Sequence, residues 1–243
     1  MATYGLIGKN IEYSFSKQYF EQKFKTEKRK DKYHIFDLPD LTKLPELIAT
    51  HEKLKGFNVT IPYKQSIIPF LDALDTEAEK IGAVNTVKIN RNGQLIGYNT
   101  DVYGFAKSLF DFLPLQQNTA LLLGNGGACK AVKFVLETMN FNVTIVSRKQ
   151  SNNTILYEDI DSKIITNHSL IVNCTPLGTY PNIQSYPKIP YQYINKNQLL
   201  FDLTYNPKIT EFMKLGIAQG AKATNGLKML QLQAEKSWEV WTK

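Results

Sequence analysis

Residues 121–128 read Leu-Leu-Leu-Gly-Asn-Gly-Gly-Ala, and this stretch decides the fold. An apolar strand, predicted at residues 119–123, runs into a glycine-rich loop, and a predicted helix follows at residues 128–139. Glycines let the backbone turn tightly and approach a phosphate, while the N–H groups at the helix start bind negative charge. Cys129 occupies the third glycine position of the G-x-G-x-x-G pattern. The strand–loop–helix order favours a dinucleotide site over an ordinary glycine turn.

The end of the next strand indicates which dinucleotide would bind. A strand is predicted at residues 141–146, and Ser147, Arg148 and Lys149 follow it without an acidic residue. NAD enzymes usually carry Asp or Glu about 20 residues after the first glycine, where it bonds the ribose 2′-hydroxyl. An arginine instead offers a planar fork of donors to a 2′-phosphate. The pattern favours NADP over NAD, and the alternative is a solvent-exposed basic turn.

Outward from this loop, helices and strands alternate along the whole chain. A helix is predicted at residues 102–113 and strands at 170–173 and 199–203, which indicates βαβ units and a parallel sheet. The first hundred residues suggest strands at 3–7, 33–38 and 56–60 and helices at 16–25, 41–51 and 65–80. A hairpin at 84–98, turning at Asn92-Gly93, adds antiparallel strands. We therefore predict an α/β protein of two domains, with a mixed sheet in residues 1–102 and a Rossmann-like sheet in 103–224.

The composition limits the possible partners. The chain has 243 residues, of which 43% are hydrophobic and 21% charged, as in ordinary globular proteins. Its formal net charge of +7 favours anionic partners. The densest basic stretch, residues 23–32, also holds Glu27 and Asp31, and we interpret it as a solvated surface. Because aromatic and basic residues do not alternate in stripes, we expect no nucleic-acid partner.

Metal sites, disulfides and membrane segments are not predicted. Cys129 and Cys174 lie far apart in sequence, and neither is near a histidine at metal-ligand spacing. No apolar run approaches the roughly 18 residues that a membrane span requires. The first residues also lack a charged segment followed by an apolar one. We therefore expect a soluble, cytoplasmic protein without a metal.

Polar clusters stand near the ends of the predicted strands of the first hundred residues. They are Ser14-Phe15-Ser16, NVTIPYK at 58–64, GAVNT at 82–86 and GYNTD at 97–101. Open α/β sheets bind their ligands at strand ends. Each cluster alone has an ordinary explanation, because serines cap helices, Asn and Asp suit turns, and a lone Lys or Asp is usually a surface charge.

Together the motifs resemble the shikimate dehydrogenase family, which includes shikimate/quinate enzymes. Their order is S-x-S, NVTIPYK, GAVNT, GYNTD, GNGGA at 124–128, NCTPLG at 173–178, and NGLKML at 225–230 followed by Gln233-Ala234. The resemblance covers essentially the whole chain. It implies that a last helix, in residues 225–243, returns to pack on the first domain.

The resemblance also implies roles for individual residues. Lys64 and Asp101 match the family's catalytic pair. The groups that match binding sites for the carboxylate and ring hydroxyls of a small acid are Ser14, Ser16, Thr60, Asn85, Tyr205 and Gln233. The groups that match NADP contacts are Gly124, Asn125, Gly126, Gly127, Ala128, Ser147, Arg148, Lys149, Asn173, Thr175 and Gly226. The sequence departs from the family pattern at Tyr13, where histidine is common, and at Lys17, where proline is common.

The implied reaction is the reversible, NADPH-dependent reduction of 3-dehydroshikimate to shikimate in aromatic amino-acid (chorismate) biosynthesis, by a monomer or homodimer. Hydride delivery leaves negative charge on oxygen, which a lysine ammonium stabilises and can protonate. We hypothesise that Lys64 is the acid/base and that Asp101 orients it. Two alternatives stay open: a dehydrogenase of relaxed substrate or cofactor use, such as quinate or NAD, and a non-catalytic NADP-binding regulator on the same fold.

Overall fold

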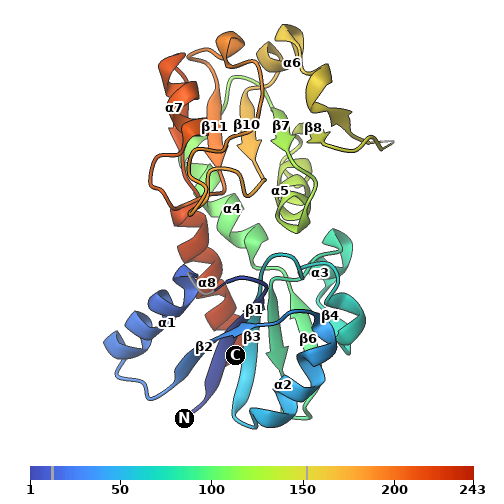
Figure 1. Ribbon diagram of the computed structural model, residues 1–243, viewed down its shortest axis with the longest axis vertical. Coiled ribbons are helices and arrows are strands. Elements are labelled where there is room, and N and C mark those ends of the chain that lie inside the picture. Colours follow the sequence, from blue (N-terminus) through green and yellow to red (C-terminus); the bar gives the residue numbers. More distant parts are fainter. Residues whose placement is uncertain (12–13, 152) are drawn as a thin grey trace. The chain divides into compact units, whose positions relative to one another are not determined.

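The chain folds around two six-stranded sheets. Its computed structural model describes residues 1–11, 14–151 and 153–243, so Tyr13 lies outside the described residues. Contacts divide the chain into two compact units (Figure 1). Unit 1 comprises Met1–Thr100 and Gln233–Lys243, and unit 2 comprises Asp101–Leu232.

The sheet of unit 1 is mixed. Its strands lie in the order β2-β1-β3-β5-β6-β4. Strands β1, β2 and β3 run parallel, whereas β5 is antiparallel to both β3 and β6, and β4 is parallel to β6. Their bounds are β1 Thr3–Gly8, β2 Lys32–Asp37, β3 Leu54–Val59, β4 Ala73–Leu74, β5 Thr86–Ile89 and β6 Leu95–Tyr98. The predicted hairpin is thus β5 and β6.

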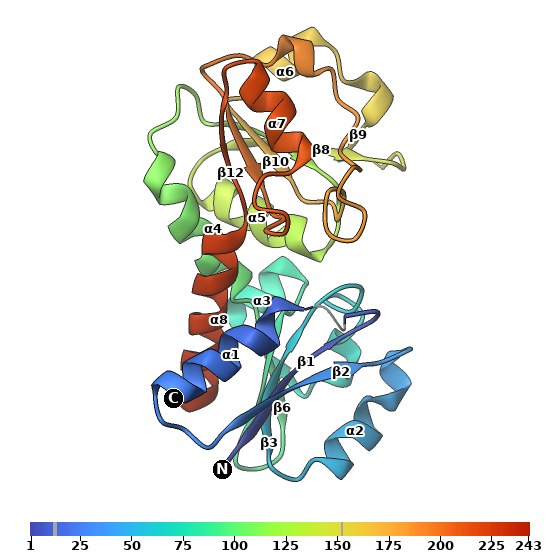
Figure 2. The same ribbon diagram turned by 60° about the vertical axis from the view of Figure 1, so that its left-hand side comes forward.

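Each face of this sheet carries its own core, because successive strand side chains point to opposite faces. Helices α2 (Leu44–Thr50) and α3 (Thr76–Ile81) cover one face, in a cluster that includes Ile7, Phe57 and Val87. Helix α1 (Phe15–Thr26) covers the other face (Figure 2). The end of α8 (Leu227–Thr242) joins it there through Ala234, Trp238 and Trp241. The expected packing of the last helix on the first α/β unit is confirmed.

The predicted helix at residues 65–80 is wrong. Residues Ile68–Phe70 form a 3-10 helix with Pro69 inside it, β4 follows, and α3 begins only at Thr76. Proline lacks the N–H that a continuous helix needs. Asp75 then starts a new helix, because its side chain accepts hydrogen bonds from the N–H groups of Glu77 and Ala78.

The sheet of unit 2 is parallel throughout. Its strands are β7 Thr119–Leu123, β8 Asn142–Ser147, β9 Ile155–Leu156, β10 Leu170–Asn173, β11 Leu199–Asp202 and β12 Lys222–Thr224. Read from β9, their order is β9-β8-β7-β10-β11-β12. Numbered along the chain, this is 3-2-1-4-5-6, the order of dinucleotide-binding sheets. The strand order reverses between β7 and β10, where such sheets bind their ligands. The predicted fold class is therefore confirmed.

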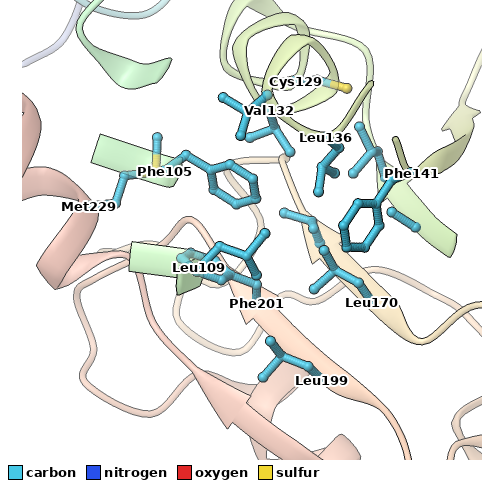
Figure 3. Close-up of a cluster of buried hydrophobic side chains, with 14 of the residues drawn as sticks. Phe105, Leu109, Cys129, Val132, Leu136, Phe141, Leu170, Leu199, Phe201 and Met229 are labelled. Carbon is cyan, nitrogen blue, oxygen red and sulfur yellow. The ribbon is translucent and has the colours of Figure 1, made fainter. Parts of the chain in front are cut away.

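Helices cover both faces of the second sheet. Helices α4 (Asp101–Leu109) and α5 (Gly127–Thr138) bury Phe105, Leu109, Val132 and Leu136 against one face (Figure 3). Met229, near the start of α8, joins the same cluster. Helices α6 (Ser162–Thr166) and α7 (Glu211–Ala218) pack on the other face. This arrangement leaves the loop after β7 at the point of strand reversal.

Candidate substrate and cofactor sites

Four strand ends of unit 1 meet at one edge of its sheet. Strands β1 and β3 end side by side, since Ile7 pairs with Val59. The antiparallel strand β5 begins beside the end of β3, where Asn58 pairs with Thr86, and Thr86 in turn pairs with Tyr98 at the end of β6. The predicted substrate residue Thr60 follows β3 directly, and its N–H donates to the Ile7 carbonyl over 2.9 Å. The polar clusters of the sequence therefore share this edge.

A buried hydrogen-bond network joins two predicted substrate residues, Asn85 and Gln233. The Asn85 side-chain Nδ2 donates to Thr100 Oγ1 over 3.0 Å and to Gln233 Oε1 over 3.3 Å. In return, the Thr100 N–H donates to Asn85 Oδ1 over 2.7 Å. Asn85, Thr100 and Gln233 are 3%, 3% and 9% exposed. The side-chain amides of Asn85 and Gln233, far apart in sequence, thus lie side by side in one network.

Ser14 and Ser16 lie at the start of α1. Ser14 caps this helix, since its hydroxyl accepts a hydrogen bond of 3.3 Å from the Ser16 N–H. Tyr33 connects this end of α1 to the network, because its hydroxyl donates to Asn58 Oδ1 over 2.9 Å. Burial raises the pKa of Tyr33 well above its usual value, and a hydrogen bond with the Ser16 side chain acts in the opposite direction. Ser14 therefore has a capping role, and Ser16 lies beside Tyr33, which contacts the polar edge.

Both predicted catalytic residues connect to the network through the backbone, Lys64 by a hydrogen bond to the residue before Asn85 and Asp101 as the residue after Thr100. The Lys64 carbonyl accepts a hydrogen bond of 2.7 Å from the Val84 N–H, and Val84 precedes Asn85. Asp101 directly follows Thr100, begins α4 and is 5% exposed. The Lys64 side chain is half-buried. Backbone connections thus tie both residues to the amide network.

The loop after β7 has the features of an anion site. Gly124 has φ +107°, a left-handed backbone that favours glycine. Gly126 caps α5 without a side-chain hydrogen bond, and the first turn of α5 holds no acidic residue. A Cβ added to Gly126 would meet no atom within 4 Å, so packing within the chain does not demand this glycine. Asn125, Gly127 and Ala128 complete the loop and the helix start, which suits a phosphate at the N-terminus of α5.

The ends of β8 and β10 flank this loop. Ser147 ends β8, and both Arg148 and Lys149 are exposed directly after it. The hydroxyl of Tyr157 is buried without a partner in the described part of the chain. Burial raises its pKa to about 12 and nearby Cys174 adds to the rise, while the Arg148 guanidinium lowers it. An exposed cation and an unpartnered buried hydroxyl fit a polar ligand there.

The side chains of Asn173 and Thr175 build the loop after β10. Asn173 Oδ1 accepts hydrogen bonds from the N–H and the hydroxyl of Thr175, over 3.0 and 2.6 Å. Asn173 Nδ2 donates to Asp202 Oδ1 over 3.0 Å. The Cys174 N–H donates to the Leu123 carbonyl over 2.9 Å. These contacts hold the loop against the end of β7, so its backbone adjoins the glycine loop.

Tyr205 and Gly226 are the remaining predicted site residues. Both belong to unit 2, and Tyr205 follows β11 in a half-buried position. Gly226 has a packing reason of its own, because an added Cβ would collide with the backbone of Leu203. Within the described residues no cluster of His, Cys, Asp or Glu could hold a metal, and no helix there could cross a membrane.

Comparisons with known proteins show the family of this chain. Residues 6–87 match the family model of the shikimate dehydrogenase substrate binding domain. The NADP(+) shikimate dehydrogenase of Methanococcus maripaludis is 39% identical, over 98% of this chain and 91% of the relative. The chain belongs to the shikimate dehydrogenase family.

Solved structures of this family share the whole fold. A shikimate 5-dehydrogenase from Thermus thermophilus, in complex with NADP(H) and shikimate, has a TM-score of 0.88 and 29% identity, covering 100% of this chain and 94% of that one. A quinate dehydrogenase from Corynebacterium glutamicum in complex with NAD has a TM-score of 0.87 and 27% identity, covering 99% and 93%.

Sequence reasoning missed part of the site of this shikimate dehydrogenase family member. Asn58, Thr100 and Ser237 were not singled out for binding roles, yet all three lie in the network around Asn85. A signal for Ser237 existed, because it stands four residues after Gln233 in a predicted helix and so on the same face. The buried partners on β3 and β5 become visible only when the strands are paired.

Proposed function

We propose that this protein is an NADP-dependent shikimate dehydrogenase that interconverts 3-dehydroshikimate and shikimate in the biosynthesis of aromatic compounds. The observation that carries the proposal is the buried network of Asn85, Thr100 and Gln233, which leads directly into Asp101. Its support is membership of the family and a parallel sheet whose strand order is typical of dinucleotide binding.

Substrate binding needs groups that bond several hydroxyls and a carboxylate. Asn85 and Gln233 offer amides, and Ser14, Ser16 and Thr60 offer hydroxyls; Tyr205 is assigned a hydroxyl role from the family resemblance. A site built to bond hydroxyls discriminates strongly against analogues that lack them, because its own polar groups would be left unpaired. The density of such groups at one sheet edge therefore supports a polyhydroxylated acid as the substrate.

Lys64 is the proposed acid/base. Reduction of the ring ketone leaves negative charge on its oxygen, which the Lys64 ammonium stabilises and to which it transfers a proton. In the reverse direction the neutral amine takes the proton from the hydroxyl. Asp101 positions Lys64 and the substrate through its carboxylate. The Thr100 N–H donates to Asn85 Oδ1, and Asp101 is the next residue. This bond therefore fixes the backbone before Asp101 relative to the Asn85 amide.

NADP, when bound, supplies or accepts the hydride. Residues 124–128 and the N-terminus of α5 would hold its pyrophosphate, because the open space at Gly126 admits a close approach. Arg148, with Ser147 and Lys149, would hold the 2′-phosphate at the end of β8, and Gly226 would complete the contacts. The basic end of β8 is the reason to prefer NADP over NAD.

The alternative within the family is a quinate or NAD-using dehydrogenase, favoured by the likeness to the Corynebacterium glutamicum enzyme. The deciding measurement offers the purified protein shikimate and quinate, each with NADP⁺ and with NAD⁺, and follows absorbance of the reduced nicotinamide. We expect turnover chiefly with shikimate and NADP⁺. Preference for quinate or NAD⁺ would favour the alternative dehydrogenase. Silence in all four combinations, from folded protein that binds NADP⁺, would favour a regulator.

The role of Lys64 is tested by Lys64→Ala. Loss of a general acid/base lowers kcat by about a thousandfold, while the KM for shikimate stays within about threefold of wild type. The matched control is Lys55→Ala, which removes an exposed lysine from β3 and keeps wild-type kinetics. A large rise in KM at unchanged kcat would instead make Lys64 a binding residue.

A further inference from the structure

The hydroxyl of Ser237 lies at the centre of the polar network of unit 1. It donates to the Gln233 carbonyl over 2.9 Å and accepts from Asn58 Nδ2 over 2.9 Å. It also contacts the hydroxyls of Thr86 and Thr100, at 2.8 and 3.0 Å. Ser237 is 0% exposed, so water does not complete its hydrogen bonds. One hydroxyl therefore touches β3, β5, the segment after β6 and the preceding turn of α8.

A hydroxyl at this position is not what packing alone would select. Of the neighbouring buried residues of α8, Gln233 is polar, whereas Ala234, Trp238 and Trp241 belong to an apolar cluster. An alanine at position 237 would keep the helix and this apolar surface. A buried hydroxyl stabilises only when it is fully hydrogen-bonded, and a satisfied buried network in turn fixes one arrangement of its members. The Ser237 hydroxyl therefore fixes the arrangement of the Gln233 carbonyl, the Asn58 amide and the Thr86 and Thr100 hydroxyls around it.

The donors and acceptors of the network can be followed from Ser237 outward. Because a carbonyl only accepts, the Ser237 proton goes to Gln233 O, and its Oγ accepts from Asn58. Asn58 presents its Nδ2 to Ser237 because its Oδ1 accepts from Tyr33. This chain of bonds leaves a single orientation for the Asn58 amide.

The side-chain amides of Asn85 and Gln233 belong to the same network. Thr86 and Thr100, both in contact with Ser237, also lie within 3.1 and 3.2 Å of Asn85 Oδ1. The Thr100 N–H also donates to that oxygen over 2.7 Å, so Asn85 Oδ1 is an acceptor and Asn85 Nδ2 is turned to Thr100 Oγ1 and Gln233 Oε1. The amide of Gln233 is held at its oxygen, which sets Nε2 as its donor end. Ser237 is thus linked to Asn85 through Thr86 and Thr100, and to Gln233 through the Gln233 carbonyl.

We propose that Ser237 is a positioning residue, which orients the amides of Asn85 and Gln233 for the ring hydroxyls of the substrate through its hydrogen bonds to Gln233 O and Asn58 and its contacts with the Thr86 and Thr100 hydroxyls. The inference rests on the proposed function. It predicts that loss of the hydroxyl weakens substrate binding without removing any group that contacts substrate, cofactor or the transferred proton.

The test is Ser237→Ala, with steady-state kinetics measured well below the unfolding temperature. We expect the KM for shikimate to rise about three- to tenfold, the fold-change that corresponds to one misdirected hydrogen bond. The kcat stays within about twofold and the KM for NADP⁺ is unchanged, because an orientation lost in ground state and transition state alike affects binding only. A purely structural role would lower the unfolding temperature and leave the KM unaltered.

Two further variants keep the test decisive. Thr86→Val removes another hydroxyl that contacts Ser237 and Asn85 at nearly constant shape, and it decides the matter if Ser237→Ala does not fold. The matched control is Ser108→Ala, since Ser108 is 2% exposed and donates over 2.7 Å to the carbonyl four residues earlier, as Ser237 does. The control should leave both KM values at wild type.

The outcomes separate the two proposals. Wild-type KM for shikimate in both Ser237→Ala and Thr86→Val, in an active enzyme, overturns the positioning role and leaves the proposed function standing. An equal rise in KM for Ser108→Ala overturns it too, because any lost helical hydroxyl would then have the same effect. A wild-type protein without turnover of shikimate overturns the proposed function and this inference together.

Discussion

Among single residues, Asp202 is the buried acid around which the loops of unit 2 are built. It is 0% exposed and accepts hydrogen bonds from the Thr210 hydroxyl, the Thr204 N–H and Asn173 Nδ2, over 2.6, 2.9 and 3.0 Å. Burial raises the pKa of its carboxyl to about 6, and the three hydrogen bonds oppose this rise. Desolvation therefore outweighs hydrogen bonding, and the folded chain holds the proton of Asp202 more tightly than the unfolded chain does.

This raised pKa predicts that the protein loses stability as the pH rises from about 4 to about 6. In that window the folded state binds more protons than the unfolded state, so the free energy of unfolding falls with rising pH and levels off above the folded pKa. Asp202→Asn removes the titration. Urea unfolding should show that the free energy of unfolding of the wild type falls by about 3 kcal/mol more than that of the variant between about pH 4 and about pH 6. Parallel profiles would contradict this, and the exposed Glu158→Gln should run parallel to wild type.

The sequence motifs identify the residues of the network that the family resemblance names, but not the buried residues that hold them. The motifs led to Asn85 and Gln233, and the structure joins these two by a hydrogen bond. Their catalytic and binding roles stay predictions. The motifs did not assign Asn58 a binding role, because a polar residue in a strand is expected to face water, and the one sequence signal for Ser237 is its helical spacing from Gln233. Only the pairing of β3 with β5 and the docking of α8 turn both inward.

At the scale of secondary-structure elements, α8 depends on a glycine in a neighbouring strand. The Trp241 indole lies on Gly56 of β3, and its Nε1 donates to the Val87 carbonyl over 2.9 Å. Two cations from earlier in the chain also contact α8. The Arg29 guanidinium lies 4.7 Å from the centre of the Trp238 ring, and the Lys23 ammonium pairs with the Glu235 carboxylate over 2.7 Å. The basic segment at residues 23–32 thus includes two cations that hold the end of α8.

Gly56→Ala should therefore loosen α8. An added Cβ would overlap Cδ1 and Nε1 of Trp241 and lie 2.7 Å from the Val87 oxygen, so the indole must move. Overpacking of this kind costs about 1–3 kcal/mol. Chemical unfolding should show that loss together with red-shifted tryptophan emission. As a control, Gly126→Ala meets no atom within 4 Å and should cost less than about 1 kcal/mol. Equal stability of the two variants would refute the packing argument.

Elements with strong local signals were predictable, and short ones were not. The glycine loop with its flanking strand and helix, and the hairpin at Asn92-Gly93, appear as predicted. Strands β4 and β9, of two residues each, carry too little periodicity to be recognised. Helix α7 is not among the predicted helices, although Thr210 caps it. The long helix predicted across Pro69 failed because apolar spacing outweighed the proline signal.

For the whole molecule, the two tryptophans provide a selective probe. Both of the chain's tryptophans, Trp238 and Trp241, lie in the part of α8 that belongs to unit 1. They are 9% and 6% exposed and pack with Tyr4, so their emission reports the packing of unit 1. The predicted domain limits, 1–102 with 225–243 and 103–224, stay a prediction. We propose that they separate the substrate-binding region from the cofactor-binding region.

That division predicts different thermal responses to the two ligands. A ligand that binds only the folded form stabilises it by about 2.7 kcal/mol at one hundred times its Kd, which raises the melting temperature of a domain of this size by on the order of 10 °C. The proposed division puts the shikimate contacts chiefly in unit 1, so shikimate should raise the transition seen by tryptophan emission. NADP⁺ should raise the transition seen by far-UV circular dichroism while the tryptophan transition moves little. If each ligand shifted both signals equally, the chain would unfold as one cooperative block, and the assignment of substrate and cofactor to separate regions would lose its thermodynamic support.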